Sequence, residues 1–232
     1  MNAPVSFQAF GATHQAVLVM TVVAVILLAT LRRARPVMAV VLERLLGSAL
    51  LLTWPASALA HWFGGDLSLD NLLPCHFCDI AAISGAIALW THHRLACEVL
   101  YFFGMAGTLQ GLLTPNLQAD FPDARFVVFF MVHAGVVVAA LHVVTAMHCP
   151  PRPGAVKRMF ALTMLYAAAA GTVNALLHTN FGFLCQKPEA ASLMDHLGPW
   201  PWYIASLIAL CVVFYSLLYA PFVIGRAWAG KR

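Results

Sequence analysis

Long runs of apolar residues, joined by short polar connections, make up most of the chain. Seven runs come close to the roughly 20 residues that a helix needs to cross the hydrocarbon core of a bilayer. They predict spanning helices at residues 14–31, 43–63, 72–91, 95–113, 125–147, 158–178 and 202–224. The pattern therefore predicts an all-α fold, a seven-transmembrane-helix bundle that forms one transmembrane domain over residues 1–232.

The overall composition supports a membrane location. Of the 232 residues, 62% are hydrophobic and 9% are charged, whereas soluble proteins carry about 25% charged residues. The mean hydropathy is +0.83. So few polar side chains cannot cover a soluble particle of this size, which excludes an ordinary cytosolic domain and a disordered chain.

Basic residues concentrate on one side of the predicted membrane. All but two of the 13 lysines and arginines lie in or beside the connections after the first, third and fifth runs or at the C-terminus; the exceptions are Arg125 and Lys187. The positive-inside rule therefore predicts the N-terminus outside and the C-terminus inside. These short basic clusters lack interleaved aromatic residues, so we expect no nucleic-acid partner.

Polar side chains inside spanning helices are costly to bury and usually mark a site. At 1.5 Å per residue, Cys75 lies about 6 Å, and Asp79 and His133 about 12 Å, below the outer ends of their helices. Gln110 and Asn174 lie about 8–9 Å deep on the same scale. Four predicted helices thus offer polar groups to one layer in the outer half of the membrane.

The third run supplies the centre of this layer. We place Pro74 in the first turn of its helix, so that Cys75, Cys78 and Asp79 share one face and His76 turns about 100° away. A thiol in a first turn meets unpaired N–H groups and the positive end of the helix dipole, which both favour the thiolate.

A thiol, an imidazole and a carboxylate in one layer predict a Cys-His-Asp arrangement. Cys75 would be the nucleophile, His133 the general base and Asp79 the group that orients the base. The residues expected to bind substrate or the oxyanion are His76, Cys78, Gln110, Asn174 and Asn180. Packing alone explains Cys78 equally well, and Asp79 has the alternative of pairing with a histidine to join helices.

The remaining polar residues in the runs have simpler interpretations. Glu98 lies near the inner end of the fourth run, where we expect it to snorkel or to pair with a loop cation. His61, His142 and His148 stand at run ends or alone, and we expect them to be interfacial or locally satisfied. The Trp200-Pro201-Trp202 cluster is typical of an aromatic anchor at the membrane interface.

Four blocks together resemble a known family. They read LPCHFCDIAA at 73–82, AGTLQGLLTPNL at 106–117, FPDARFVVFFMVHAG at 121–135 and VNALLHTNFGFLCQKPEAASLMDHLGPWPWY at 173–203. The sequence resembles the YwaF-type bacterial integral membrane proteins, which are related to a eukaryotic TMEM-type acyltransferase of ether phospholipids. It is more distantly similar to the androgen-induced membrane hydrolases of fatty-acid esters.

This resemblance implies an acyltransferase or lipid-ester hydrolase with Cys75 as nucleophile and His133 as base. Its implied substrate is a membrane phospholipid or lysophospholipid, and its implied location is the bacterial cytoplasmic (inner) membrane. The Pro-Cys-His order around Cys75 is similar to the eukaryotic branch. We expect no cofactor and no metal, because two thiols at i and i+3 with one histidine make a weak metal signal.

Two other functions remain open. Cys75 and Cys78 form a C-x-x-C pair that faces an oxidising compartment, as in membrane thiol oxidoreductases, with Cys185 as a relay. Placement of the pair within a helix argues against that function. The polar layer would also suit a transporter or a non-enzymatic lipid-binding protein, although the seven runs do not divide into two equal repeats.

Overall fold

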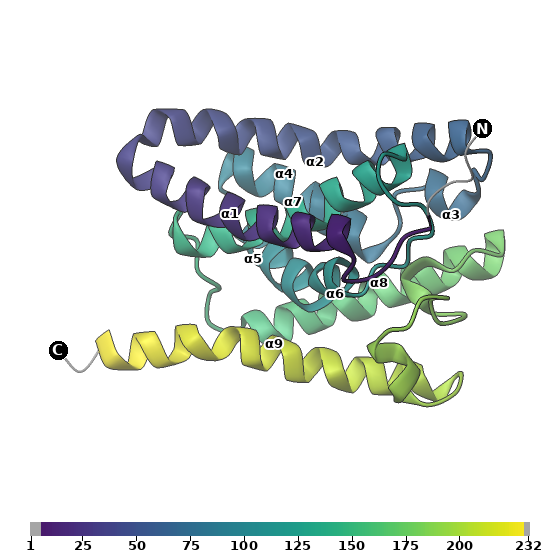
Figure 1. The fold of residues 1–232 in the computed structure, drawn as a ribbon. Coiled ribbons are helices and arrows are strands. Elements are labelled where there is room, and N and C mark those ends of the chain that lie inside the picture. The colour runs from purple at the N-terminus through teal and green to yellow at the C-terminus, as the bar shows by residue number, and fades with distance from the viewer. Residues whose placement is uncertain (1–5, 230–232) are drawn as a thin grey trace.

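A computed structural model describes residues 6–229, and helices dominate this part of the chain (Figure 1). The spanning segments are α1 (Ala12–Ala34), α2 (Pro36–Gly64), α3 (Leu69–Leu72) with α4 (Phe77–Thr91), α5 (Arg94–Phe103) with η1 (Gly104–Thr108) and α6 (Leu109–Leu113), α7 (Ala124–Thr145), α8 (Ala155–Leu177) and α9 (Trp202–Ala229). Two short 3-10 turns, η2 (Phe181–Phe183) and η3 (Leu193–Leu197), lie between α8 and α9. Within residues 6–229, seven segments are long and apolar enough to cross a membrane, which confirms the predicted fold.

The central helix of the bundle is α7, which packs against α1, α2, α4 and α5. Figure 1 shows α2 along one side of the bundle and α9 along the opposite side, with α4 and α7 between them. Large apolar side chains of α9, such as Leu217 and Trp228, are exposed. In a bilayer those side chains would contact lipid, because the bilayer solvates apolar surfaces that water would not.

The described ends of the chain lie at opposite ends of the bundle (Figure 1). Successive connections alternate between these two ends, so the basic connections around Arg33, Arg94 and Arg158 share one end. Lys231 and Arg232, which contribute to the same charge asymmetry, lie outside the described residues. The orientation of the bundle in the membrane stays a prediction. Following that prediction, we call the end of the bundle that carries α3 the outer end.

The third span is broken near its outer end, which corrects the expected first turn. Leu73 takes an extended conformation, with φ −93° and ψ 134°. The helical region of φ/ψ space is disfavoured for Leu73 because the next residue is proline. The chain re-enters a helix only at Phe77, with His76 as the N-cap. Cys75 therefore precedes α4, and Cys78 is the thiol that lies in its first turn.

The fourth span contains a π-turn, η1, between α5 and α6. Two glycines in this region allow close packing: an added Cβ on Gly107 would lie 2.5 Å from the ring of Phe77, and one on Gly111 would lie 2.6 Å from the ring of His133. The absence of a side chain on these glycines thus lets α4 and α7 approach the same face of the fourth span. π-turns are often found at functional sites.

Candidate functional site

His133 is held in a defined tautomer at the middle of α7. Its side chain is 8% exposed, and its Nδ1 lies 2.7 Å from the carbonyl oxygen of Phe129, one turn earlier. Because a carbonyl only accepts hydrogen bonds, Nδ1 carries the proton, and Nε2 of the neutral ring presents a lone pair. Among the described residues, none forms a hydrogen bond with Nε2. His133 is therefore prepared to accept a proton.

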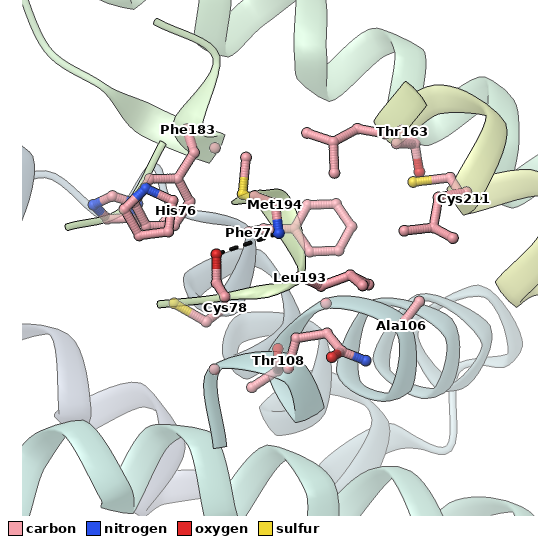
Figure 2. A pocket seen from close by; sticks show the side chains of 18 of the residues that line it. His76, Phe77, Cys78, Ala106, Thr108, Thr163, Phe183, Leu193, Met194 and Cys211 are labelled. Carbon is pink, nitrogen blue, oxygen red and sulfur yellow. Dashed lines mark hydrogen bonds between the residues drawn. The ribbon is translucent and has the colours of Figure 1, made fainter. Parts of the chain in front are cut away.

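Two cavities meet at His133. The first, of about 320 Å³, lies between η1, α8 and α9, and its walls include Ala106, Ala167, Leu207 and Phe214. No Asp, Glu, Lys or Arg lines it within residues 6–229. We call this space the apolar cavity. Figure 2 shows side chains from α4, the fourth span, α8, α9 and the loop before α9 arranged around it.

The second cavity, of about 260 Å³, lies between α2, α3 and α7. Its walls include Ser57, His61, Asp70, Asp79 and Arg125, so we call it the polar cavity. The residues that line both cavities are His76, Cys78, Asn116, Phe129, His133 and Phe183. One thiol and two imidazoles thus lie where the two spaces meet.

The structure distinguishes the two thiols of the C-x-x-C segment. Cys78 lines both cavities together with His133, whereas Cys75 lines neither. Cys75 is half-buried, and its carbonyl oxygen accepts a 3.0 Å hydrogen bond from the hydroxyl of Tyr166 on α8. The argument from the helix dipole therefore applies to Cys78, which occupies the first turn of α4, and not to Cys75.

Asp79 has a different partner from the one we expected. Its Oδ2 accepts a 2.9 Å hydrogen bond from the backbone N–H of His76 and so stabilises the start of α4. The group that orients the His133 ring is the carbonyl of Phe129. Neither role expected for Asp79 is seen among the described residues, because its contact is with the backbone N–H of His76 in the same segment and so neither orients His133 nor joins two helices.

The His76 ring points into the site although the sequence placed it on another face. Its Nε2 donates to the carbonyl oxygen of Asp70 over 3.0 Å, and its ring meets that of Phe181 edge-on at 5.0 Å. The break before α4 explains the difference, because His76 is an N-cap residue and does not follow the helical spacing.

The three expected amide donors separate into two groups. Gln110 lines the apolar cavity, and no hydrogen bond of its side-chain amide is found in the described part of the chain. Asn174 and Asn180 line neither cavity. The Asn174 side chain forms hydrogen bonds with the Thr179 hydroxyl and with the backbone of Phe181. The Asn180 side chain forms hydrogen bonds with the backbone of residues 185 and 186. Gln110 alone of the three thus has a free amide in the site.

Glycine spacing was the signal that sequence reasoning missed here. Gly107 and Gly111 form a small-x-x-x-small pair, which is typical of close helix contacts in membranes. The roles of Phe129 and Tyr166 carry no comparable signal, since each depends on a backbone contact or an interhelical distance. No group of His, Cys, Asp or Glu within residues 6–229 has the arrangement of a metal site.

Outside the cavities, buried charges pair at the inner end. Glu98 receives hydrogen bonds from the guanidinium groups of Arg152 and Arg158 at 2.8–3.1 Å, which confirms the expected pairing with loop cations. His142 is fully buried and contacts Glu43 Oε1 at 2.7 Å. The interhelical partner Glu43 was not anticipated.

At the outer end, Arg125 joins two carboxylates. Its guanidinium lies 2.7 Å from Asp123 Oδ2 and 3.0 Å from Asp66 Oδ2. The hydrogen bonds from Arg125 hold the pKa of the Asp123 carboxyl below its usual value. The positive charge at the rim of the polar cavity is therefore already paired.

Comparison with known protein families matches residues 9–219 to the TMEM164 family. The chain belongs to the TMEM164 family. Neither a search of curated proteins nor a search of solved structures returns a match. The family match and the seven spanning segments identify an integral membrane protein.

The TMEM164 match includes every residue of the candidate site and at least part of each spanning segment. It supports the TMEM-type relationship that the sequence blocks suggested. The relationships to the YwaF-type proteins and to the androgen-induced hydrolases stay predictions.

Proposed function

We propose that the protein is a membrane-embedded acyltransferase or lipid-ester hydrolase that acts on phospholipid acyl chains in the outer leaflet. The observation that carries this proposal is that His133, whose Nε2 has no hydrogen-bond partner among the described residues, lines an apolar cavity together with a thiol. An apolar cavity suits an acyl chain. A thiol beside a neutral imidazole suits attack on an ester carbonyl.

The chemistry balances with groups that the chain supplies. His133 Nε2 takes the thiol proton as the sulfur forms a bond to the ester carbonyl carbon. The ester C–O bond then breaks, and the leaving lysolipid oxygen takes the proton from His133. The acyl group remains on sulfur as a thioester. A lysolipid hydroxyl or water then attacks the thioester and loses its proton to His133. The C–S bond breaks, and the sulfur takes that proton back from His133, which restores the thiol.

Two thiols are candidates for the nucleophile. The resemblance implies Cys75, whose position before α4 would require its side chain to turn inward. The cavities favour Cys78, because it lines both of them with His133. We therefore assign the attack to this segment and rank Cys78 first on geometry.

Gln110 is the best-placed oxyanion donor. Its amide lines the cavity without a hydrogen-bond partner in the described residues, and a preorganised N–H donor stabilises the negative charge that develops on an ester oxygen. None of these steps requires a cofactor. The proposed location is the bacterial cytoplasmic membrane, with the site in its outer half.

The test is the intact and peptide mass of the purified protein after incubation with mixed phospholipids. We expect an acyl adduct in the peptide that carries Cys75 and Cys78. The variants Cys78→Ser and Cys75→Ser identify the acylated sulfur, and Cys185→Ser, which changes an exposed loop thiol, is the matched control.

His133→Ala should abolish both the adduct and acyl exchange in vesicles. Retention of normal acyl exchange in His133→Ala would overturn the proposal. So would the absence of any adduct together with normal exchange in both cysteine variants.

A thiol oxidoreductase is the second candidate, favoured by one observation. Cys75 precedes α4 and Cys78 lies in its first turn, so the C-x-x-C pair spans the start of the helix, which removes the objection raised from the sequence. Oxidation of Cys75 and Cys78 to a disulfide would remove two hydrogen atoms from their peptide. That mass loss, without an acyl adduct, would favour this function.

A further inference from the structure

Two cavities reach the same thiol and imidazole, and among the described residues charged side chains line only one of them. Cys78 and His133 line both the apolar cavity and the polar cavity. Among the helices that line only one of the two cavities, α8 and α9 line the apolar cavity, and α2 and α3 line the polar cavity. Figure 1 places α2 and α9 on opposite sides of the bundle.

From this arrangement we propose that the site has two separate entrances, one for the acyl chain and one for the hydroxyl group that accepts it. The acyl chain occupies the apolar cavity, and water or the glycerol hydroxyl of a lysolipid reaches the thioester through the polar cavity. This inference rests on the proposed acyl chemistry, but the existence of two entrances can be tested without it.

The residues around the polar cavity suit a hydroxyl group better than a phosphate. Asp70 Oδ1 accepts the backbone N–H of Asn180, and Asp79 Oδ2 accepts that of His76. Their other carboxylate oxygens have no hydrogen-bond partner among the described residues. These oxygens can accept hydrogen bonds from water or an alcohol, and their charge would repel a phosphate.

The cation at the rim does not reverse this preference. The guanidinium of Arg125 already contacts Asp66 and Asp123, so little positive charge remains to attract a phosphate. His61 at the same rim also contacts Asp66, with Nδ1 3.0 Å from Oδ1. Donor-bearing neutral groups are therefore the chemical class that this cavity would take.

Aromatic rings line both spaces where they meet. The ring of Phe129 stacks on that of His133 with a centroid distance of 4.0 Å, and Phe183 lies 6.4 Å from the ring of His76. All four side chains line both cavities. In the proposal these rings form the partition between the two entrances, so that reagents reach the thiol from either side.

The matched variants place the same new side chain in one cavity at a time. Ser57→Phe on α2 fills the polar cavity, and Ala167→Phe on α8 fills the apolar cavity; both positions are half-buried. In the full protein reconstituted in nanodiscs, labelling of Cys78 is followed by peptide mass. The polar probe is N-(2-hydroxyethyl)maleimide, which is neutral and carries a hydroxyl, and the apolar probe is N-dodecylmaleimide.

Filling one cavity should slow one probe and spare the other, because a filled cavity has no room for a reagent. We expect Ser57→Phe to slow the polar probe about tenfold with little effect on the apolar probe, and Ala167→Phe to do the reverse. Labelling of the exposed Cys185 should stay constant and serves as the internal reference for the amount of each probe that reaches the protein. The smaller replacements Ser57→Leu and Ala167→Leu give the same test if either phenylalanine prevents folding.

Equal slowing of both probes by each variant, or no slowing by either, would overturn the two-entrance proposal. With mixed phospholipids, Ser57→Phe should also raise the amount of acyl adduct, because the acceptor is excluded while the chain still enters. Added lysophospholipid separates the two acceptors: phospholipid as product indicates the glycerol hydroxyl, and free fatty acid indicates water.

The two proposals can fail independently. Selective labelling without an acyl adduct would support the entrances and reject the acyl chemistry. An adduct on Cys75 or Cys78 without selective labelling would keep the acyl chemistry and reject the entrances.

Discussion

The carbonyl oxygen of Phe129 accepts a 2.7 Å hydrogen bond from Nδ1–H of His133, and the centroid of the Phe129 ring lies 4.0 Å from that of the imidazole. One residue thus fixes both the tautomer and the plane of the proposed base. A backbone carbonyl performs the orienting role that a carboxylate performs in many hydrolases. The proposed thiol and imidazole therefore need no third side chain to keep the ring proton of His133 on Nδ1.

Gly111→Ala tests whether the position of His133 controls activity. The new Cβ would lie 2.7 Å from Nε2 and would displace the ring. A displacement of this kind costs about a hundredfold in rate. Acyl exchange in vesicles should fall by about that factor. The matched control is Gly171→Ala on α8, where the nearest atom to an added Cβ is 4.0 Å away and activity should be retained. Equal activity in the two variants would contradict the prediction.

The outer ion pairs should make stability depend on pH in the acid range. Arg125 holds the pKa of Asp123 below its ordinary value of 3.8. Such a carboxylate stabilises the fold above its unfolded pKa, and this contribution is lost as the pH falls through the folded value. The melting temperature should therefore drop below a pH of about 4. The drop should be smaller in Arg125→Gln, and parallel curves for the two proteins would refute the assignment.

Glu98→Gln should destabilise the inner end of the bundle. Glu98 is 2% exposed and anchors two arginines, so the neutral variant leaves both guanidinium groups without a charged partner. We expect a loss of about 2 kcal/mol, less than for a fully buried pair because the arginines are partly exposed. Denaturant unfolding in detergent measures this loss. Glu189→Gln, at an exposed loop position, should change stability by less than about 0.5 kcal/mol.

The spans could be predicted because their signal is local. Hydropathy and length are properties of a continuous segment, and they located all seven helices. The largest difference is at α2, which begins at Pro36 and not at residue 43. The start of the third span was wrong because Pro74 is compatible with either a first turn or an extended segment. Nothing in the neighbouring sequence decides between a first turn and an extended segment. The structure has the extended segment, so Cys75 lies before the helix and not in it.

The site was predicted as a layer but not as a set of contacts. Depth along each helix grouped His133 with Gln110, and both line one cavity. The same argument placed Cys75 in that layer, but Cys75 lines neither cavity. Depth alone could not show that Asn174 is occupied by loop contacts. The rotation of a helix about its axis and the path of a loop depend on interhelical packing, which one sequence does not encode locally.

Tyr166→Phe tests the link between α8 and the segment that carries Cys75. The variant keeps the ring, which meets Phe77 edge-on at 5.3 Å, and removes only the hydrogen bond to the Cys75 carbonyl. We expect a stability loss of about 1 kcal/mol and faster labelling of Cys75 by maleimide, because its backbone is released.

Tyr203→Phe is the matched control for that release. It removes a hydrogen bond of the same kind, from the Tyr203 hydroxyl to the Phe183 carbonyl at 2.6 Å, and leaves the Cys75 segment untouched. The control should lose similar stability without any change in the labelling rate of Cys75. If both variants label Cys75 at the same rate, Tyr166 does not restrain the segment, and the inward turn that Cys75 would need as a nucleophile must be limited by another contact.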